Sequence, residues 1–275
     1  MAPVAPTAFE SGRRLCLLFE AGESRFAVEA TAVVEVASPD EDGKSIRGHL
    51  ELEDLSELLS GPPEVRPGMG VVLDVSPTLA ARVRRIVEVA DVARDPFFML
   101  PPGVRDALAA LARGAILHGG RLYLELIAEA LPRLPAELPR VPPRAVLLLE
   151  TPPERGLVFE SQGVLYGLPL SVVSQVVPRS DAFCPLPSRR GPALGLFPHA
   201  QALWPVYSFA GLLGGVGEPE PLLVLSELAG QSVGFCASRV LGVHQDFRRA
   251  ESRGEFEAGN LPRGALFLDL QRMFS

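Results

Sequence analysis

The sequence predicts a mainly β protein built from two copies of one module. Three observations support this prediction: a repeat at a fixed offset, short apolar segments separated by turn residues, and a proline-rich segment between the two copies. A chain of 275 residues, 47% of them hydrophobic, is long enough to bury a core in each of two modules. We therefore expect two folded domains.

The repeat is clearest near the start of each copy. LLFE at Leu17–Glu20 recurs 140 residues later as LVFE at Leu157–Glu160. At the same offset, apolar and small residues of the segment 26–36 fall on matching residues of the segment 166–176. An ungapped match over about 20 residues does not arise readily by chance, so the two halves are expected to share one fold.

A hairpin is predicted in the middle of each half. The first half contains GVVLDV (70–75) followed by ARVRRIVEV (81–89), and the second contains LLVLSEL (222–228) followed by SVGFCASRVLGV (232–243). Val, Leu and Ile dominate these segments, and a tight turn separates the members of each pair. We expect two antiparallel strands in each case.

Helices are expected to be few and short. The clearest candidates are 54–59 and 103–114, where leucines and alanines recur at helical spacing up to Gly114. Short helices are also expected at the ends of the segments 121–131 and 265–274, each of which begins as a strand. Because strands do not alternate with long helices, small β-barrels fit the pattern better than an α/β sheet.

The boundary between the modules is placed in PRLPAELPRVPPR, whose five prolines favour an extended spacer. The strand-like segment 144–150 has no clear counterpart in the first half, and its pairing stays open. The predicted organisation is a flexible N-terminus, a first domain, a linker and a second domain, at 1–13, 14–131, 132–143 and 144–275.

Composition excludes several classes of function. The net charge of -7 and the pI near 5.3 argue against a nucleic-acid partner, which requires a basic surface. No apolar run of about 18 residues and no signal peptide are present, so we expect a cytoplasmic protein without membrane insertion. The cysteines, Cys16, Cys184 and Cys236, are expected to be reduced core thiols.

Catalytic and metal-binding motifs are weak. Gly230–Gly234 matches G-x-S-x-G, but a strand follows it where a nucleophile elbow requires a helix, so a hairpin turn is predicted. The four histidines, His49, His118, His199 and His244, lack partners at metal-ligand spacing. We expect no enzyme, no metal and no cofactor, and retain a hydrolase using Ser232 only as an alternative.

The assembled segments resemble the CheW-like domain, the adaptor module of bacterial chemotaxis signalling, twice over nearly the whole chain. The resemblance is clearest in the second half, at 157–177, 193–214 and 232–243. It implies two small five-stranded SH3-like β-barrels per domain and no catalytic activity. It also implies binding to a CheA-type histidine kinase and to the cytoplasmic tips of chemoreceptors.

The sequence departs from the family pattern at its central motifs. In the second half the family's arginine-glycine pair falls on Ala200 and Gln201, and the Asp of its Pro-Val-x-Asp-Leu motif falls on Ser208. In the first half Asp54-Leu55 keeps the Asp-Leu pair, and Arg47-Gly48 is a candidate for the arginine-glycine pair, displaced by one residue.

The two halves also differ in length between the first hairpin and this motif. Val36 and Asp54 are 18 residues apart, whereas Val176 and Ser208 are 32 apart. The first half is therefore expected to have lost a barrel strand or to bend differently. Conversely, the second half lacks the piece that contains Pro101-Pro102 and the alanine-rich helix.

Register in the repeat and the resemblance together select the candidate protein-binding residues. These are Val33, Glu35, Arg47 and Asp54 in the first half and Val173, Gln175 and Trp204 in the second. Each apolar candidate has an alternative as a core residue, because a buried strand face also favours β-branched side chains and a tryptophan can fill a core.

The functional hypothesis is a non-catalytic tandem CheW-like adaptor. It would couple a CheA-type histidine kinase to chemoreceptors or to a related protein cluster. The alternative is a degenerate CheW-like protein that acts outside a receptor array as a self-associating or regulatory scaffold. The loss of the arginine and aspartate positions favours this alternative.

Overall fold

The computed structural model describes residues 13–59, 61, 63–64, 68–134, 146–187, 192–250, 252 and 254–275. Contacts divide the chain into two compact units. Unit 1 comprises residues 1–140, 181–189 and 198–203, and unit 2 comprises residues 141–180, 190–197 and 204–275. Two short segments of the second half therefore belong to the unit that is formed mainly by the first half.

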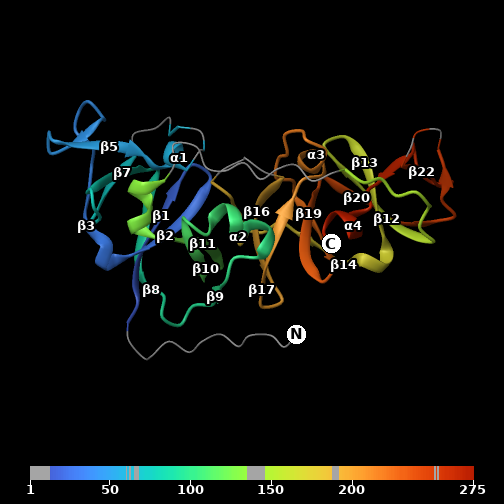
Figure 1. The fold of residues 1–275 in the computed structure, drawn as a ribbon, viewed down its shortest axis with the longest axis horizontal. Helices are drawn as coiled ribbons and strands as arrows, with labels where there is room; N and C mark the ends of the chain where they lie inside the picture. The colour runs from blue at the N-terminus through green and yellow to red at the C-terminus, as the bar shows by residue number, and fades with distance from the viewer. Residues whose placement is uncertain are drawn as a thin grey trace. The chain divides into compact units, whose positions relative to one another are not determined.

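The first sheet begins with a hairpin and is completed by strands from the end of the first half (Figure 1). Its order is β8-β1-β2-β11-β10-β9. β11 runs parallel to β2, which brings the last long strand of this half beside the opening hairpin. The strands are β1 (Leu15–Ala21), β2 (Ser24–Glu29), β8 (Arg85–Asp91), β9 (Phe97–Phe98), β10 (Ala112–His118) and β11 (Arg121–Leu126).

The second sheet is formed by the middle of the first half. Its order is β3-β6-β7-β5-β4, with β5 parallel to β7. A small cluster of Ile46, Leu52, Val72 and Ala80 forms a buried core in it. The strands are β3 (Val33–Ala37), β4 (Ser45–Ile46), β5 (Leu50–Asp54), β6 (Met69–Leu73) and β7 (Leu79–Val83).

The second half repeats the first sheet strand for strand. The order β20-β12-β13-β23-β22-β21 matches that of the first sheet, and β23 is parallel to β13 as β11 is to β2. The strands are β12 (Arg155–Ser161), β13 (Val164–Pro169), β20 (Arg239–Gln245), β21 (Arg248–Arg249), β22 (Glu255–Glu257) and β23 (Ala265–Phe267).

The remaining sheet has the order β14-β18-β19-β17-β16-β15 and repeats the second sheet with one strand added. β16 is also much longer than β4, its counterpart in the shorter first half. This difference agrees with the shorter sequence between Val36 and Asp54. The strands are β14 (Val173–Pro178), β15 (Cys184–Pro185), β16 (Ala193–His199), β17 (Ala202–Tyr207), β18 (Leu222–Leu228) and β19 (Gln231–Ala237).

The predicted mainly β fold in two tandem copies is confirmed, with two differences in strand structure. Three sheets contain a sixth strand of two residues at an edge, where five strands were expected. The segment 81–89 is two strands rather than one, because Arg84 interrupts it and its backbone N–H donates to the carbonyl of Glu20. Ser238 interrupts the second half in the same way and donates to the carbonyl of Glu160.

The described helices are short. The prediction of one helix over 103–114 was wrong, because the α-helix ends at Leu108 and Ala112 already begins β10. Gly114 lies against Phe97 and the carbonyl of Phe98, so strand pairing overrides helix propensity there. The elements are η1 (Ala30–Ala32), α1 (Leu55–Leu58), α2 (Pro102–Leu108), η2 (Ala128–Arg133), η3 (Leu170–Val172), α3 (Phe209–Leu212) and α4 (Leu270–Met273).

An aromatic core lies at the centre of unit 2. The ring of Phe209 lies 5.2 Å from that of Phe159 and 4.5 Å from that of Tyr166, centroid to centroid. The described part of the segment 144–150 joins this unit, since Leu148 forms a β-bridge with Leu268. The predicted linker from residue 135 onward, like residues 1–12, lies outside the described residues.

Candidate protein-binding site

Three of the candidate residues of the first half lie together. Val33 and Glu35 are on β3, and the carboxylate of Glu35 lies 2.5 Å from the guanidinium of Arg47, which directly follows β4. Since β3 and β4 are the two end strands of their sheet, this ion pair shows that the sheet curls back on itself. Arg47 remains 68% exposed and can therefore still meet a partner.

The outer face of β3 is apolar and exposed. A bulge between Val33 and Glu35 interrupts the pairing with β6 and sets Val34 apart from the ladder. Val34 is 61% exposed and Val36 is 38% exposed, whereas Val33 is half-buried. The two exposed valines lie beside the Glu35–Arg47 pair, so this edge of unit 1 is both apolar and charged.

The turn that follows β4 is equivalent to the turn that follows β16. Arg47 and Gly48 have φ angles of 54° and 71°, and Ala200 and Gln201 have 48° and 62°. In each half this left-handed pair precedes a strand that leads into a short helix. Arg47-Gly48 and Ala200-Gln201 thus occupy the same place in the fold, although their distances from the helix differ by one residue.

The next candidate, Asp54, caps α1. Its Oδ1 accepts from the backbone N–H groups of Ser56 and Glu57 at 2.9 and 3.2 Å, and its Oδ2 accepts from that of Glu64 at 2.9 Å. Ser208 caps α3 in the second half, where its hydroxyl accepts from Gly211 at 3.2 Å. Both carboxylate oxygens of Asp54 therefore accept backbone hydrogen bonds, and the residue stabilises the start of α1. Its predicted role in partner binding stays a prediction.

The second-half candidates are less open. Val173 is half-buried and packs against the core of unit 2, while Gln175 is exposed on β14 after a bulge equivalent to that of β3. Trp204 is only 4% exposed. Trp204 is therefore a core residue, as the alternative interpretation expected, and its side chain is not accessible to a partner in this structure.

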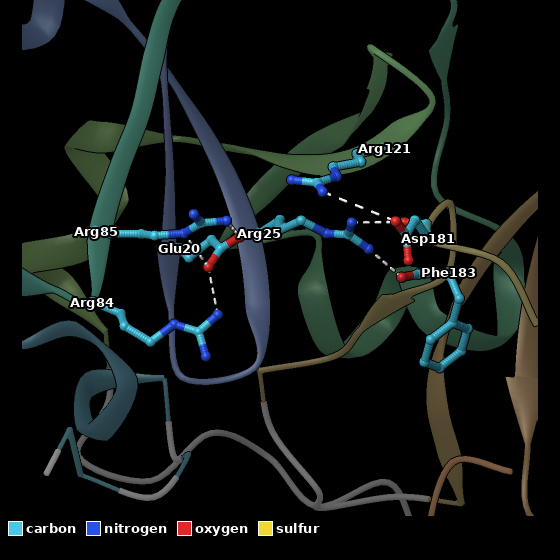
Figure 2. Close-up of polar contacts among 7 residues, drawn as sticks. All are labelled: Glu20, Arg25, Arg84, Arg85, Arg121, Asp181 and Phe183. Atoms are coloured by element: carbon cyan, nitrogen blue, oxygen red, sulfur yellow. Dashed lines mark hydrogen bonds and ion pairs between the residues drawn. The ribbon is translucent and has the colours of Figure 1, made fainter. Parts of the chain in front are cut away.

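Sequence reasoning missed a charged cluster behind the first hairpin. Glu20 is buried and accepts from the side chains of Arg84 and Arg85 (Figure 2). The hydrogen bonds from Arg85, with a smaller contribution from Arg84, lower the pKa of Glu20 to about 2. The sequence did contain one indication of this cluster, since Glu20 and Glu160 occupy equivalent positions in the repeat. Glu160 also binds an arginine, Arg239, at 2.7 Å.

The structure gives no support to the hydrolase alternative. Ala229 and Gly230 form the predicted hairpin turn, and β19 follows directly, so Ser232 lies on a strand. Its hydroxyl donates to Glu227 on the neighbouring strand at 2.8 Å. Strand–turn–strand geometry does not project a serine as a nucleophile elbow does.

The cysteines and the other polar residues offer little additional chemistry. Burial raises the pKa of Cys16 and Cys236 to about 11 and also raises that of Cys184, which favours the protonated thiol at all three positions while they remain buried. Among the described residues, no group of three or more His, Cys, Asp or Glu side chains is arranged to hold a metal ion. No described helix is long and apolar enough to cross a membrane.

Comparison with known proteins finds a family match in the second half of the chain. Residues 155–273 match the family model of the CheW-like domain. A solved structure, that of the scaffolding protein TtCheW from Thermoanaerobacter tengcongensis, is similar at 12% identity and a TM-score of 0.37. The similarity covers 46% of this chain and 98% of that chain. A search of curated proteins found no match.

Proposed function

We propose that the protein is a non-catalytic adaptor of chemotaxis-type signalling that couples a CheA-type histidine kinase to chemoreceptors or to a related protein cluster. The match of residues 155–273 to the CheW-like domain carries this proposal. A cytoplasmic location and the absence of a nucleic-acid partner follow from the same role and suit the net charge of -7.

The tandem arrangement is supported by the repeated strand order. The sheet containing β1 and the sheet containing β12 have the same order, including one parallel pair each. We therefore propose that the first half, at 14–131, is a second, diverged CheW-like domain, joined to the domain at 144–275 by the linker at 132–143.

Within the first half, we place the partner surface on the outer edge of β3. Val34 and Val36 supply exposed apolar area, and Arg47 supplies an accessible guanidinium next to Glu35. An apolar patch with a charged rim is the usual composition of a transient protein interface. In the second half, the corresponding turn has Ala200 in place of Arg47, so we expect the two halves to bind with different strength.

The test is a direct binding measurement with the purified full-length chain and a purified CheA-type kinase from the same genome. Wild-type protein should bind, and Val36→Asp combined with Arg47→Ala should raise Kd at least about tenfold, equivalent to roughly 1.4 kcal/mol. Val164→Asp is the matched control, since it places the same charge on an exposed valine of the second half, outside the proposed surface.

Two outcomes count against this assignment. If neither the kinase nor a receptor fragment binds the wild-type chain, the adaptor role is wrong. If binding is intact but Val164→Asp weakens it as much as the double variant does, the surface is misplaced. Sedimentation of the same samples distinguishes the adaptor from the alternative self-associating scaffold, because the scaffold would form concentration-dependent oligomers without the kinase.

A further inference from the structure

Arg25 in unit 1 binds main-chain carbonyl groups of a segment that is remote in sequence. Its Nη1 donates to the carbonyl of Asp181 at 2.6 Å, and its Nη2 donates to the carbonyl of Phe183 (Figure 2). The carbonyl of Arg25 in turn faces the thiol of Cys184 at 3.8 Å. The guanidinium fork thus holds an extended main chain rather than a carboxylate.

The held segment is well packed. Phe183 and Cys184 are buried, the latter at 0% exposure, and the strand that contains Cys184, β15, contacts both β2 and β11. Arg121, at the start of β11, adds an ion pair of 3.9 Å to the exposed carboxylate of Asp181. Residues 181–189 accordingly belong to unit 1, although their neighbours in sequence at 141–180 belong to unit 2.

This arrangement is specific to the first half. At the offset of the repeat, Arg25 corresponds to Leu165, a buried residue of β13. An arginine in place of a core leucine requires acceptors, and the Nε of Arg25 is buried without a partner among the described atoms. The two carbonyl groups of the segment accept hydrogen bonds from the guanidinium of Arg25. These bonds offset the cost of shielding the guanidinium from water when the segment covers it.

We propose that residues 181–187, which include the edge strand β15 beside β16, form a latch, a segment that docks on the β2–β11 surface of unit 1 and can leave this surface while β2 and β11 remain folded. Arg25 is its anchor. Because the anchor recognises main-chain carbonyl groups of an extended segment, the uncovered surface accepts a second copy of this segment in place of the latch.

The accessibility of the Cys184 thiol measures whether the latch is docked. Undocking exposes its thiol, whereas Cys16 and Cys236 lie at 0% exposure within strands β1 and β19 and serve as internal controls. Full-length protein is treated with a thiol reagent under native conditions, and labelling at each cysteine is followed by peptide mass spectrometry. Arg25→Leu, the residue found at the equivalent place of the second half, should accelerate labelling of Cys184 at least tenfold and leave the other two unchanged.

Two matched variants test how the segment is recognised. Asp181→Asn removes the carboxylate that faces Arg121 and keeps the carbonyl that Arg25 binds, so Cys184 should stay protected. Arg239→Leu removes an exposed arginine of the second half that pairs with Glu160, and it too should leave Cys184 protected. Equal labelling of Cys184 in Arg25→Leu and in wild type would overturn the proposal.

Wild-type protein provides a test that does not depend on the folding of a variant. In low urea, Cys184 should label faster than Cys16 and Cys236 and with a smaller dependence on urea, because local opening exposes less surface than unfolding. A single common rate for all three thiols would show that the segment leaves only when the protein unfolds, and would contradict the latch.

A peptide tests replacement of the segment. The probe is a synthetic peptide of residues 179–187 that carries Cys184→Ser. In excess, it should accelerate labelling of Cys184 in wild-type protein by competing for Arg25, and it should have no such effect on Arg25→Leu. Unchanged labelling of the wild-type protein at saturating peptide would disprove replacement of the latch by a second extended segment.

Discussion

Glu20 and Arg85 form a bidentate ion pair between neighbouring strands of the first sheet. Nε of Arg85 lies 2.8 Å from Oε2 of Glu20, and Nη2 lies 2.7 Å from Oε1. Arg84 donates to the same carboxylate, and its backbone N–H donates to the carbonyl of Glu20. This cluster fixes the point at which β7 ends and β8 begins, and so couples the two sheets of the first half.

The first prediction concerns pH. The pKa of Glu20 falls from its ordinary value of 4.5 to about 2 in the folded protein, mainly through the hydrogen bonds from Arg85. A lowered folded-state pKa contributes stability that is fully present above about pH 4.5 and is lost as the pH falls towards 2. Between pH 5 and pH 2, the wild-type free energy of unfolding should therefore fall by roughly 3 kcal/mol more than that of Glu20→Gln.

Urea unfolding at a series of pH values measures this difference. Glu20→Gln keeps the shape of the side chain and removes the titrating group. Parallel pH profiles for the two proteins would show that Glu20 does not carry the acid sensitivity.

A second prediction compares the two copies of this pair. Among the described residues, Glu160 forms an ion pair with Arg239 only, and its side chain is 22% exposed, whereas Glu20 is buried between two arginines. Glu20→Ala should therefore destabilise the protein by about 2–3 kcal/mol, and Glu160→Ala by less than about 1 kcal/mol. Equal losses for the two variants, measured by urea unfolding at pH 7, would contradict the role assigned to burial.

Local sequence patterns predicted the strands well and failed where tertiary contacts decide. The repeat and the valine-rich runs predicted the opening hairpins and the middle strands of both halves. They did not predict the interruptions at Arg84 and Ser238, because each lies inside a continuous run of strand-forming residues. Only the backbone bonds to Glu20 and Glu160 mark these breaks, and the residues that form them are distant in sequence.

The candidate site was predictable in part. The repeat placed Val33 and Glu35 on one strand, and the family pattern suggested Arg47, which the structure brings to 2.5 Å from Glu35. Burial of Trp204 could not be settled from a single sequence, because tryptophan occurs both in cores and at interfaces. Arg25 gave no signal, since its acceptors are main-chain groups and any sequence supplies these.

The third prediction concerns the helix caps. Asp54 accepts three backbone N–H groups, and Ser208 accepts one. Asp54→Ala should cost about 2 kcal/mol of folding free energy and Ser208→Ala about 1 kcal/mol or less. Asp54→Asn keeps an acceptor oxygen and should recover most of the loss. An Asn variant as unstable as the Ala variant would indicate that capping is not the reason for the loss.

The fourth prediction arises from a buried carboxylate that the second half lacks. Glu125 is 0% exposed, and its Oε1 lies 2.5 Å from Nη2 of Arg14, while its Oε2 is buried without a partner among the described atoms. Pairing with Ala27 places Glu125 where the second half has Phe267, which pairs with Gly167. One position of the fold is therefore filled by an ion pair in one half and by an aromatic ring in the other.

Removing only the arginine leaves the carboxylate of Glu125 buried, and among the described residues its remaining cation is the more distant Arg113, at 3.5 Å. Arg14→Met should therefore destabilise the protein by about 3 kcal/mol, because the desolvation of Glu125 is no longer compensated. Arg14→Met combined with Glu125→Leu makes the site apolar, as in the second half, and should recover most of this loss. Urea unfolding of the single and double variants measures the coupling. A double variant no more stable than Arg14→Met would show that Glu125 is retained for packing that leucine cannot replace, and not because of its charge.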